Sequence, residues 1–186
     1  MHHWTNALVK LNACNEAVEW AKTQPSLAAA WKNCKRGDWM MWLLGRTCKG
    51  GAWSDERKPI VACAAECAST TEKYVHPDSL LAWMWCIDAC ERWSRGEADR
   101  DEVEAARSAA AADDADAVYA AAAAAAAAAA YAAYAAAAAA AAADADAVYA
   151  AAAAAYADAA REQSLANSAE IVRRHFPVAP RLGVRS

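Results

Sequence analysis

The sequence predicts an all-α fold: a compact bundle of about 7–9 helices, with alanine-rich, closely packed helical hairpins in the C-terminal half. Three observations indicate this class. Apolar residues in the first half recur at the spacing of a helix face. Residues 109–160 consist mostly of alanine, the best helix former, with almost only Tyr, Asp and Val between. No stretch carries the strand signal of alternating apolar and polar residues.

The 186 residues are expected to form a single domain that is large enough to bury a core. Within it, residues 1–98 form a helical half rich in Trp and Cys, residues 99–176 an alanine-rich helical half, and residues 177–186 a flexible basic tail. All nine tryptophans lie in the first half. The net charge of −4 is unevenly spread, since the alanine-rich block carries aspartates and no base, which argues against a nucleic-acid surface there.

Helices are expected in the first half at residues 6–22, 26–36, 39–44, 59–73 and 79–93. Pro25 and Ser26 open the second of these, and Gly37 is placed to end it in the left-handed conformation. Asp38 caps the third helix, which is apolar on every side and is therefore expected to be the most buried element. Gly96 closes the last.

Aspartates interrupt the alanine-rich second half and mark where its helices are expected to start. Asp99 and Glu102 form a capping-box pattern that starts a helix leading into the alanine-rich block. The run Asp-Ala-Asp-Ala-Val-Tyr occurs twice, from Asp114 and from Asp144. One straight helix through the block would be about 80 Å long, longer than such a domain is wide. New helices are therefore expected to start at Asp113 or Asp114 and at Asp144.

The same block is expected to drive self-association. Long uncharged alanine faces pack best against one another, and left bare they would form an apolar patch that monomers seldom tolerate. Tyr131 and Tyr134 supply the large side chains of this region and mark a further bend. We therefore expect a homo-oligomer.

Residues 117–143 are uncharged and long enough to span a bilayer. Alanine is only marginally apolar, however, and aspartates flank the run, so we expect no interaction with a membrane. The start of the chain, Met1-His2-His3-Trp4, has none of the features of a secretion signal. Together with an odd count of seven cysteines, this predicts reduced thiols and a cytoplasmic location.

Two CxxxC pairs, Cys63 with Cys67 and Cys86 with Cys90, lie on neighbouring expected helices. Residues four apart share a helix face, so the four sulfurs could form a tetrahedral zinc site or two disulfides. Alternatively, the cysteines pack as small apolar side chains where helices approach closely. Structural zinc ligands usually come from turns with two-residue spacings, so packing is favoured, and we expect neither metal nor cofactor.

Indole rings and guanidinium groups together make good pockets for nucleobases and phosphates, or hot spots for a protein partner. They also fill helical cores, which is the simpler interpretation. Basic residues at the end of the last helix, before Pro177, could bind a phosphate or carboxylate, although helix-end electrostatics explains them equally well. The candidate ligand- or partner-binding residues are Trp39, Trp42, Arg46, Trp83, Arg92, Arg95, Arg173, Arg174 and His175.

The sequence contains no catalytic pattern. His76 lies in an expected turn beside Asp78, with no nucleophile at a suitable spacing. The triplet Arg36-Gly37-Asp38 is the integrin-binding tripeptide, but here it is explained by a helix end followed by a helix cap. No acid–base pair or phosphate-binding loop accompanies these residues, so we expect that the protein is not an enzyme.

Three segments carry a resemblance to a known family: residues 14–20, residues 34–43, and residues 171–177. The most specific is Cys-Lys-Arg-Gly-Asp-Trp-Met-Met-Trp-Leu, residues 34–43. With these and its alanine-tyrosine run, the chain resembles the Imm-5-like group of bacterial and phage immunity proteins. The resemblance implies a small cytoplasmic protein that protects a cell or a phage by binding something harmful, without catalysis. It carries over no catalytic residue.

The function expected from the sequence is therefore non-enzymatic binding. The first hypothesis is a protein that neutralises a toxin or defence effector by direct association. The alternative is a sequestering protein that holds a small signalling molecule, such as a nucleotide, in a pocket lined by Trp and Arg. These differ structurally, because sequestration needs an enclosed cavity and inhibition needs an exposed, ordered patch. Neither requires nucleic acid or a membrane.

Overall fold

The computed structural model describes residues 4–75, 80–113 and 147–182. These residues form eight α-helices and two short 3-10 helices, with no β-strand among them, which confirms the all-α class. Asp113 is the last described residue of a helix that begins at Arg100. The other expected helix starts, at Asp114 and Asp144, lie outside the described residues, as do the tyrosines expected to support self-association.

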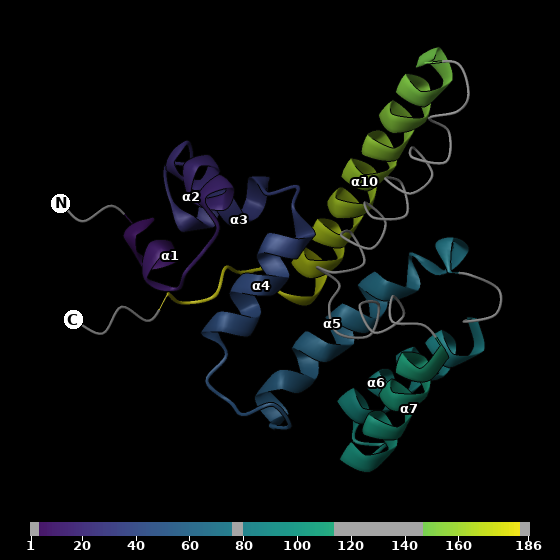
Figure 1. Ribbon diagram of the computed structural model, residues 1–186. Coiled ribbons are helices and arrows are strands. Elements are labelled where there is room, and N and C mark those ends of the chain that lie inside the picture. The colour runs from purple at the N-terminus through teal and green to yellow at the C-terminus, as the bar shows by residue number, and fades with distance from the viewer. Residues whose placement is uncertain (1–3, 76–79, 114–146, 183–186) are drawn as a thin grey trace.

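In chain order, the elements are α1 (Asn6–Lys10), α2 (Asn15–Lys22), α3 (Leu27–Asn33), α4 (Gly37–Thr47), η1 (Asp55–Arg57), α5 (Lys58–Ser69), η2 (Glu72–Tyr74), α6 (Leu80–Arg95), α7 (Arg100–Asp113) and α10 (Ala147–His175). The C-terminal part of α10 lies between α4 and α5 and contacts both (Figure 1). On one side α4 leads to the short helices α1–α3; on the other, α5 packs on α6, and α6 on α7.

The largest core cluster forms where α10 meets the N-terminal helices. It contains buried residues from α1 to α5 together with Ala169, Ile171 and Val172 of α10. Val172 is fully buried, with an exposed fraction of 0%. Small residues such as Ala169 and Cys63 let α10 and α5 approach closely. The thiol of Cys67 on α5 donates a hydrogen bond to the carbonyl of Ser168 on α10, at 3.9 Å.

Gly37 does not end the second helix, as the sequence predicted. That helix, α3, ends at Asn33, and Gly37 is instead the first residue of α4. Its φ is not positive; of the described glycines only Gly96 has a positive φ. A Cβ on Gly37 would lie 2.5 Å from the Cβ of Ser168 and 2.7 Å from the backbone nitrogen of Ala169. Glycine is needed there for close packing of α4 on α10, not for backbone freedom.

The single helix predicted for residues 6–22 is also wrong. Asn12 adopts a positive φ of 63° and separates α1 from α2. The N–H of Ala13 donates to the carbonyl of Leu8, and the N–H of Asn12 to that of Val9. This is the Schellman arrangement, in which asparagine can replace glycine because it tolerates the left-handed conformation. The apolar spacing continued across the break and concealed it.

Other boundaries follow the predicted signals. Ser26 caps α3 by accepting from the N–H of Ala29, at 3.2 Å. Gly96, with φ of 79°, ends α6 as expected. Asp99 accepts from the N–H of Glu102, at 2.9 Å, so the predicted cap of α7 forms. The expected helix at 59–73 is shorter, because α5 ends at Ser69 and a 3-10 turn follows.

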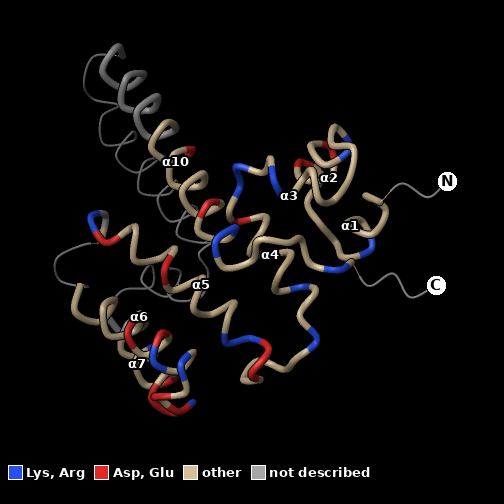
Figure 2. Tube along the Cα trace, turned by 180° about the vertical axis from the view of Figure 1, so that it is seen from behind, with Lys and Arg blue, Asp and Glu red and all other residues tan. Residues whose placement is uncertain are grey.

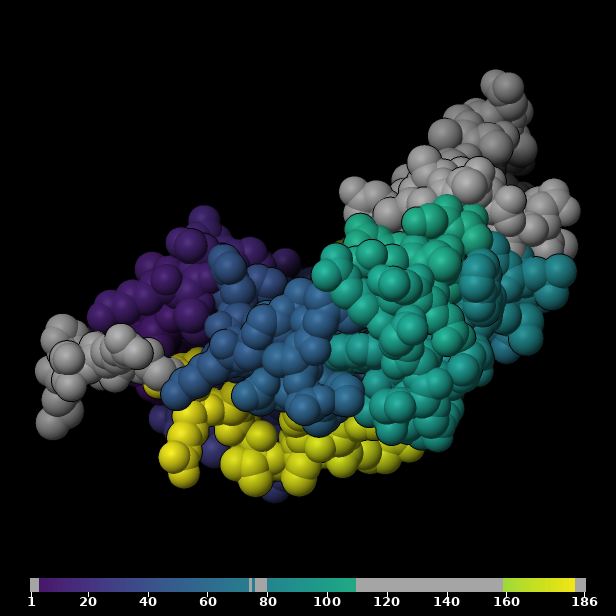
Figure 3. Space-filling view, turned by 90° about the horizontal axis from the view of Figure 1, so that it is seen from below, coloured from purple at the N-terminus to yellow at the C-terminus, as the bar shows by residue number. Residues whose placement is uncertain are grey.

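The chain folds back along the core after α10. Phe176, Ala179 and Leu182 are half-buried against the largest core cluster. In Figure 3 these last described residues, in yellow, lie against the purple and blue N-terminal third of the molecule. As far as Leu182, the segment predicted to be a flexible tail is therefore packed on the core. Among the helices of the described residues, none has the length and apolar character needed to cross a membrane.

Candidate ligand-binding pocket

A cavity of about 430 Å³ opens among the N-terminal helices. Its volume lies within the range of about 300–1,000 Å³ that is typical of small-molecule sites. Helices α1 to α4 and the segments between them supply its walls. Aromatic side chains dominate it: the cavity, called the tryptophan pocket below, is lined by Trp4, Trp20, Trp31, Trp39 and Trp42.

Helix geometry brings the indoles together. Trp39 and Trp42 are three residues apart on α4 and therefore share a face of that helix. Trp20 of α2 meets Trp39, with ring centroids 5.9 Å apart and planes tilted by 53°. These indoles are only half-buried, because they face the cavity. The other four residues of the third predicted helix, Met40, Met41, Leu43 and Leu44, are buried.

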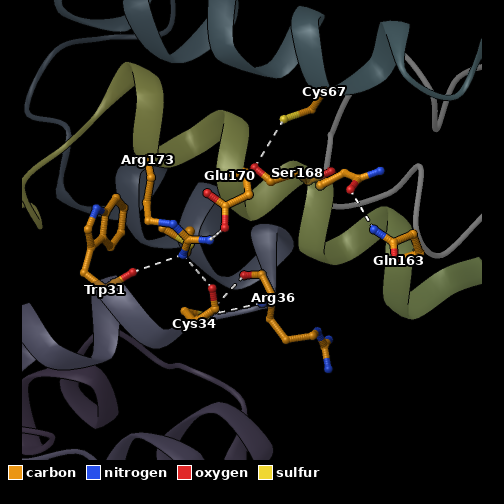
Figure 4. Close-up of polar contacts among 10 residues, drawn as sticks. Trp31, Cys34, Arg36, Cys67, Gln163, Ser168, Glu170 and Arg173 are labelled. Atoms are coloured by element: carbon orange, nitrogen blue, oxygen red, sulfur yellow. Dashed lines mark hydrogen bonds and ion pairs between the residues drawn. The ribbon is translucent and has the colours of Figure 1, made fainter. Parts of the chain in front are cut away.

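Trp31, in the wall of the pocket, is held in place by the C-terminal end of α10 and the residue after it. Trp31 is 4% exposed, and its indole N–H donates to the carbonyl of Phe176, at 2.8 Å. Arg173 donates to the carbonyls of Cys34, at 2.7 Å, and Trp31, at 3.3 Å (Figure 4). These carbonyls belong to the end of α3, where no intrahelical donor reaches them. Arg173 thereby caps α3 and joins it to α10.

An ion pair between Arg36 and Asp38 also lines the pocket. Arg36 donates from Nε and Nη2 to the two carboxylate oxygens of Asp38, at 2.9 and 2.7 Å. A third bond runs from Nη1 to Glu16, at 3.1 Å, and the guanidinium lies 4.3 Å from the centroid of the Trp39 ring. The hydrogen bonds to Asp38 raise the pKa of Arg36. Among the described lining residues, Arg36 and Asp38 carry the charges.

Two cysteines also line the pocket, Cys14 and Cys34. Burial raises the pKa of the Cys34 thiol, so this group stays protonated and is a poor nucleophile. Its sulfur accepts a hydrogen bond from the backbone N–H of Arg36, at 3.4 Å. The described lining residues include no His, Ser or Lys that could act as a base or nucleophile beside it.

The candidate residues from the sequence do not form one site. Trp39 and Trp42 line the pocket, and Arg46 lies outside it, 5.8 Å from the Trp42 ring. Trp83 belongs to a separate cluster between α5 and α6, where its indole nitrogen is buried without a hydrogen-bond partner. This divides the predicted tryptophan set between the two sides of α10.

Arg92 and Arg95 belong to the charged surface of α6 and α7, where acidic and basic residues are interspersed (Figure 2). Arg92 forms an ion pair with Glu102 of α7. Arg95 pairs with Glu97 at 2.9 Å. Arg92 therefore joins α6 to α7, and Arg95 binds the segment that follows α6. Neither residue lines the tryptophan pocket.

The three basic residues that end α10 point in two directions. Arg173 reaches α3, as described above, and also pairs with Glu170 at 2.7 Å. His175 instead contacts Glu66 of α5, with Nε2 and Oε2 2.7 Å apart, and Arg174 forms an ion pair with the same carboxylate. The hydrogen bond from His175, supported by Arg174, lowers the pKa of Glu66. The basic residues that could have bound a free phosphate or carboxylate therefore bind groups of this protein instead. They join α10 to α3 and α5.

The two CxxxC pairs lie in different clusters of the structure. Cys63 and Cys67 are buried against α10, whereas Cys86 belongs to the cluster between α6 and α7, with Cys90 packed against it. All seven cysteines are free thiols. No group of three or more His, Cys, Asp or Glu in the described parts of the chain is arranged to hold a metal ion.

Sequence reasoning missed three tryptophans and the ion pair of the pocket: Trp4, Trp20, Trp31, Arg36 and Asp38. The crowding of tryptophans before residue 43 was a signal for them. The pairing of Arg36 with Asp38 was concealed, because the triplet also fitted a helix boundary.

Comparison of the chain with protein-family models, curated proteins and solved structures finds no match. The resemblance to immunity proteins therefore stays a prediction.

Proposed function

We propose that this chain is a non-enzymatic binding protein that sequesters a small molecule in its tryptophan pocket. One observation carries the proposal: a cavity of about 430 Å³ is walled by indoles from α2, α3 and α4. Indole rings supply large, rigid contact area and stack well on flat rings. A planar aromatic molecule is the ligand that this lining suits best.

A binding role rather than catalysis fits the polar groups of the pocket. Arg36 and Asp38 neutralise each other, and the Cys34 thiol is kept protonated by burial. Catalysis requires an acid, base or nucleophile with a matched pKa and free access to substrate. Sequestration requires only shape, apolar surface and a few polar groups that orient the ligand. This role also agrees with the protection by binding that the family resemblance implies.

A second candidate, neutralisation of a protein toxin or defence effector by direct association, is supported by α6. Leu81, Met84 and Trp85 share one face of this helix and are 79%, 48% and 43% exposed. Large apolar side chains gathered on a surface are typical of protein interfaces. The pocket is favoured as the primary site because it is concave and offers far more aromatic contact to one ligand.

Isothermal titration calorimetry with 2-naphthalenemethanol, an uncharged bicyclic alcohol, tests the pocket. We expect one binding site per chain. Trp42→Ala should weaken binding at least about fivefold, because a stacked ring contributes about 1–3 kcal/mol. Trp85→Ala makes the same change on exposed α6 and should leave the affinity unchanged. Absence of binding to the wild type, or equal loss in both variants, would contradict the proposal.

Native mass spectrometry of the protein purified from its own host distinguishes the two candidates. An added mass of small-molecule size that is lost on unfolding and in Trp42→Ala supports sequestration. A protein adduct of integer stoichiometry that survives Trp42→Ala but is lost in Leu81→Asp supports direct association through α6 instead.

A further inference from the structure

Arg36 is the cation of the tryptophan pocket, and its surroundings leave it no free charge. Asp38 accepts two hydrogen bonds from it in the bidentate arrangement that makes Arg–carboxylate pairs strong. Glu16 accepts a third, and the ring of Trp39 covers one face of the guanidinium. Two carboxylates therefore pair with one guanidinium: Arg36 and Asp38 line the pocket as a neutral pair, and Glu16 lies outside the lining.

This ion pair is sheltered from solvent. The side chains of Arg36 and Asp38 are 25% and 16% exposed, so water and salt screen their charges less than at an open surface. Glu16, in contrast, is 70% exposed and contributes less. The strongest field at the cavity wall thus comes from the Arg36–Asp38 pair.

The backbone holds the two residues in place. Gly37, between them, lies against Ser168 and Ala169 of α10 so closely that a Cβ would clash. Asp38 is in the first turn of α4, where the helix dipole stabilises a carboxylate. The pair is therefore set before any ligand arrives.

The charge of a ligand determines whether it can bind favourably beside Arg36 and Asp38. A phosphate or carboxylate would have to displace Asp38 from Arg36, or lie beside the Asp38 carboxylate while Arg36 stays paired, which is unfavourable. A neutral aromatic molecule meets no such cost and gains the full contact with the indoles.

From this geometry we infer that Asp38 is a specificity-determining residue: by occupying Arg36, it restricts the pocket to aromatic ligands without negative charge and excludes nucleotides and other anions. The inference rests on the proposed function and narrows it. It also predicts a simple reversal, because removing the charge of Asp38 while keeping its shape frees Arg36 to bind an anion.

The test compares 2-naphthalenemethanol with 2-naphthoate, which has the same ring system and a carboxylate, by calorimetry at neutral pH. The wild type should prefer the alcohol by about tenfold or more. In Asp38→Asn, 2-naphthoate should bind about tenfold more tightly than to the wild type, with little change for the alcohol. In Asp38→Asn combined with Arg36→Gln, the gain should disappear, because the freed guanidinium is what binds the anion.

Matched variants control for general charge effects and for folding. Asp55→Asn breaks an ion pair with Lys58, at 2.8 Å, away from the pocket, and should change neither affinity. Glu16→Gln should also reduce the preference for the alcohol over 2-naphthoate, but by less than Asp38→Asn. If Asp38→Asn lowers the melting temperature, the affinities of Glu16→Gln test the same inference in a folded protein.

The outcomes separate the two claims. If neither probe binds the wild type, the proposed function fails. If the alcohol binds but the wild type accepts 2-naphthoate equally well, or Asp38→Asn and Glu16→Gln leave the preference unchanged, the sequestering function stands and the role of Asp38 is wrong.

Discussion

At Gly37 the backbone of α4 meets α10 at a distance that no side chain permits. The nearest atoms to an added Cβ include backbone atoms of Ser168 and Ala169, at 2.7 Å, which cannot move aside as a flexible side chain would. Gly45, on the same helix, has nothing within 4 Å of its would-be Cβ. One glycine is thus required by packing, while the other only weakens the helix.

The two positions predict opposite effects of the same substitution. Gly37→Ala should lower the free energy of unfolding by about 1–3 kcal/mol, the usual cost of forcing a methyl group into a packed interface. Gly45→Ala should raise it by about 0.5–1 kcal/mol, because alanine restricts the unfolded chain and favours helix. Urea denaturation of both variants measures these changes. Similar changes for the two would show that the close approach is absent.

Sequence reasoning succeeds at residues whose role is local. The position of Gly96 after an apolar helical run predicted that it ends the helix, and Asp99 was predicted as a cap, because both roles depend on neighbours in the chain. Gly37 and Asn12 were misjudged for the opposite reason. The need for glycine at Gly37 comes from a helix far away in sequence, and the break at Asn12 is not marked by Gly or Pro.

Among the helices, α5 and α10 are joined by Glu66, Arg174 and His175. The contact links residues far apart in sequence and lies at the C-terminal end of α10. Because the two basic groups lower the pKa of Glu66, the folded state favours its ionised form. The Glu66 contact therefore stabilises the fold at neutral pH, and this contribution is lost as the pH falls below the ordinary value of 4.5 and through the lowered folded pKa.

Glu66→Gln should therefore be less stable than the wild type near neutral pH, with the difference disappearing in acid, where both side chains are uncharged. Denaturant unfolding measured from about pH 7 to about pH 3 would check this. The exposed Glu162→Gln on α10 serves as the control. A difference between Glu66→Gln and the wild type that is constant with pH would mean that the pair contributes no charge-dependent stability.

Except for the break at Asn12 and the role of Gly37, the helices of the first half were predicted, because apolar periodicity and caps depend on residues close in sequence. The candidate site was predicted only in part, because a set of tryptophans and arginines in sequence carries no information about helix crossings. Trp39 and Trp83 were grouped together, yet α4 and α6 lie on different sides of α10, and only Trp39 reaches the pocket.

Considered as a whole, the described molecule is centred on the C-terminal part of α10. Val172 is fully buried there and belongs to the same cluster as residues from α1 to α5. All nine tryptophans, in contrast, lie in the first half of the sequence. Tryptophan fluorescence therefore reports on the N-terminal helices, while a substitution at Val172 perturbs α10.

Val172→Ala should lower the free energy of unfolding by about 1.5–3 kcal/mol, through lost apolar contact and the cavity left behind. Since one core connects the two parts, the transitions followed by fluorescence and by far-UV circular dichroism should both shift, and by the same amount. Val178→Ala, at a side chain that is 79% exposed, should cause little change. A shift in circular dichroism alone would reveal two independent folding units.

The bond from Trp31 to the carbonyl of Phe176 also has a consequence for how a new chain matures. The two residues are 145 positions apart, and Arg173 closes the same wall of the pocket from the same helix. A ribosome that adds about 5–20 residues per second needs roughly 7–30 s to make the intervening chain. During that interval the indoles have been synthesised but their supporting wall has not. The nascent protein thus exposes its most aromatic surface longest, and this is the stage at which a chaperone would protect it.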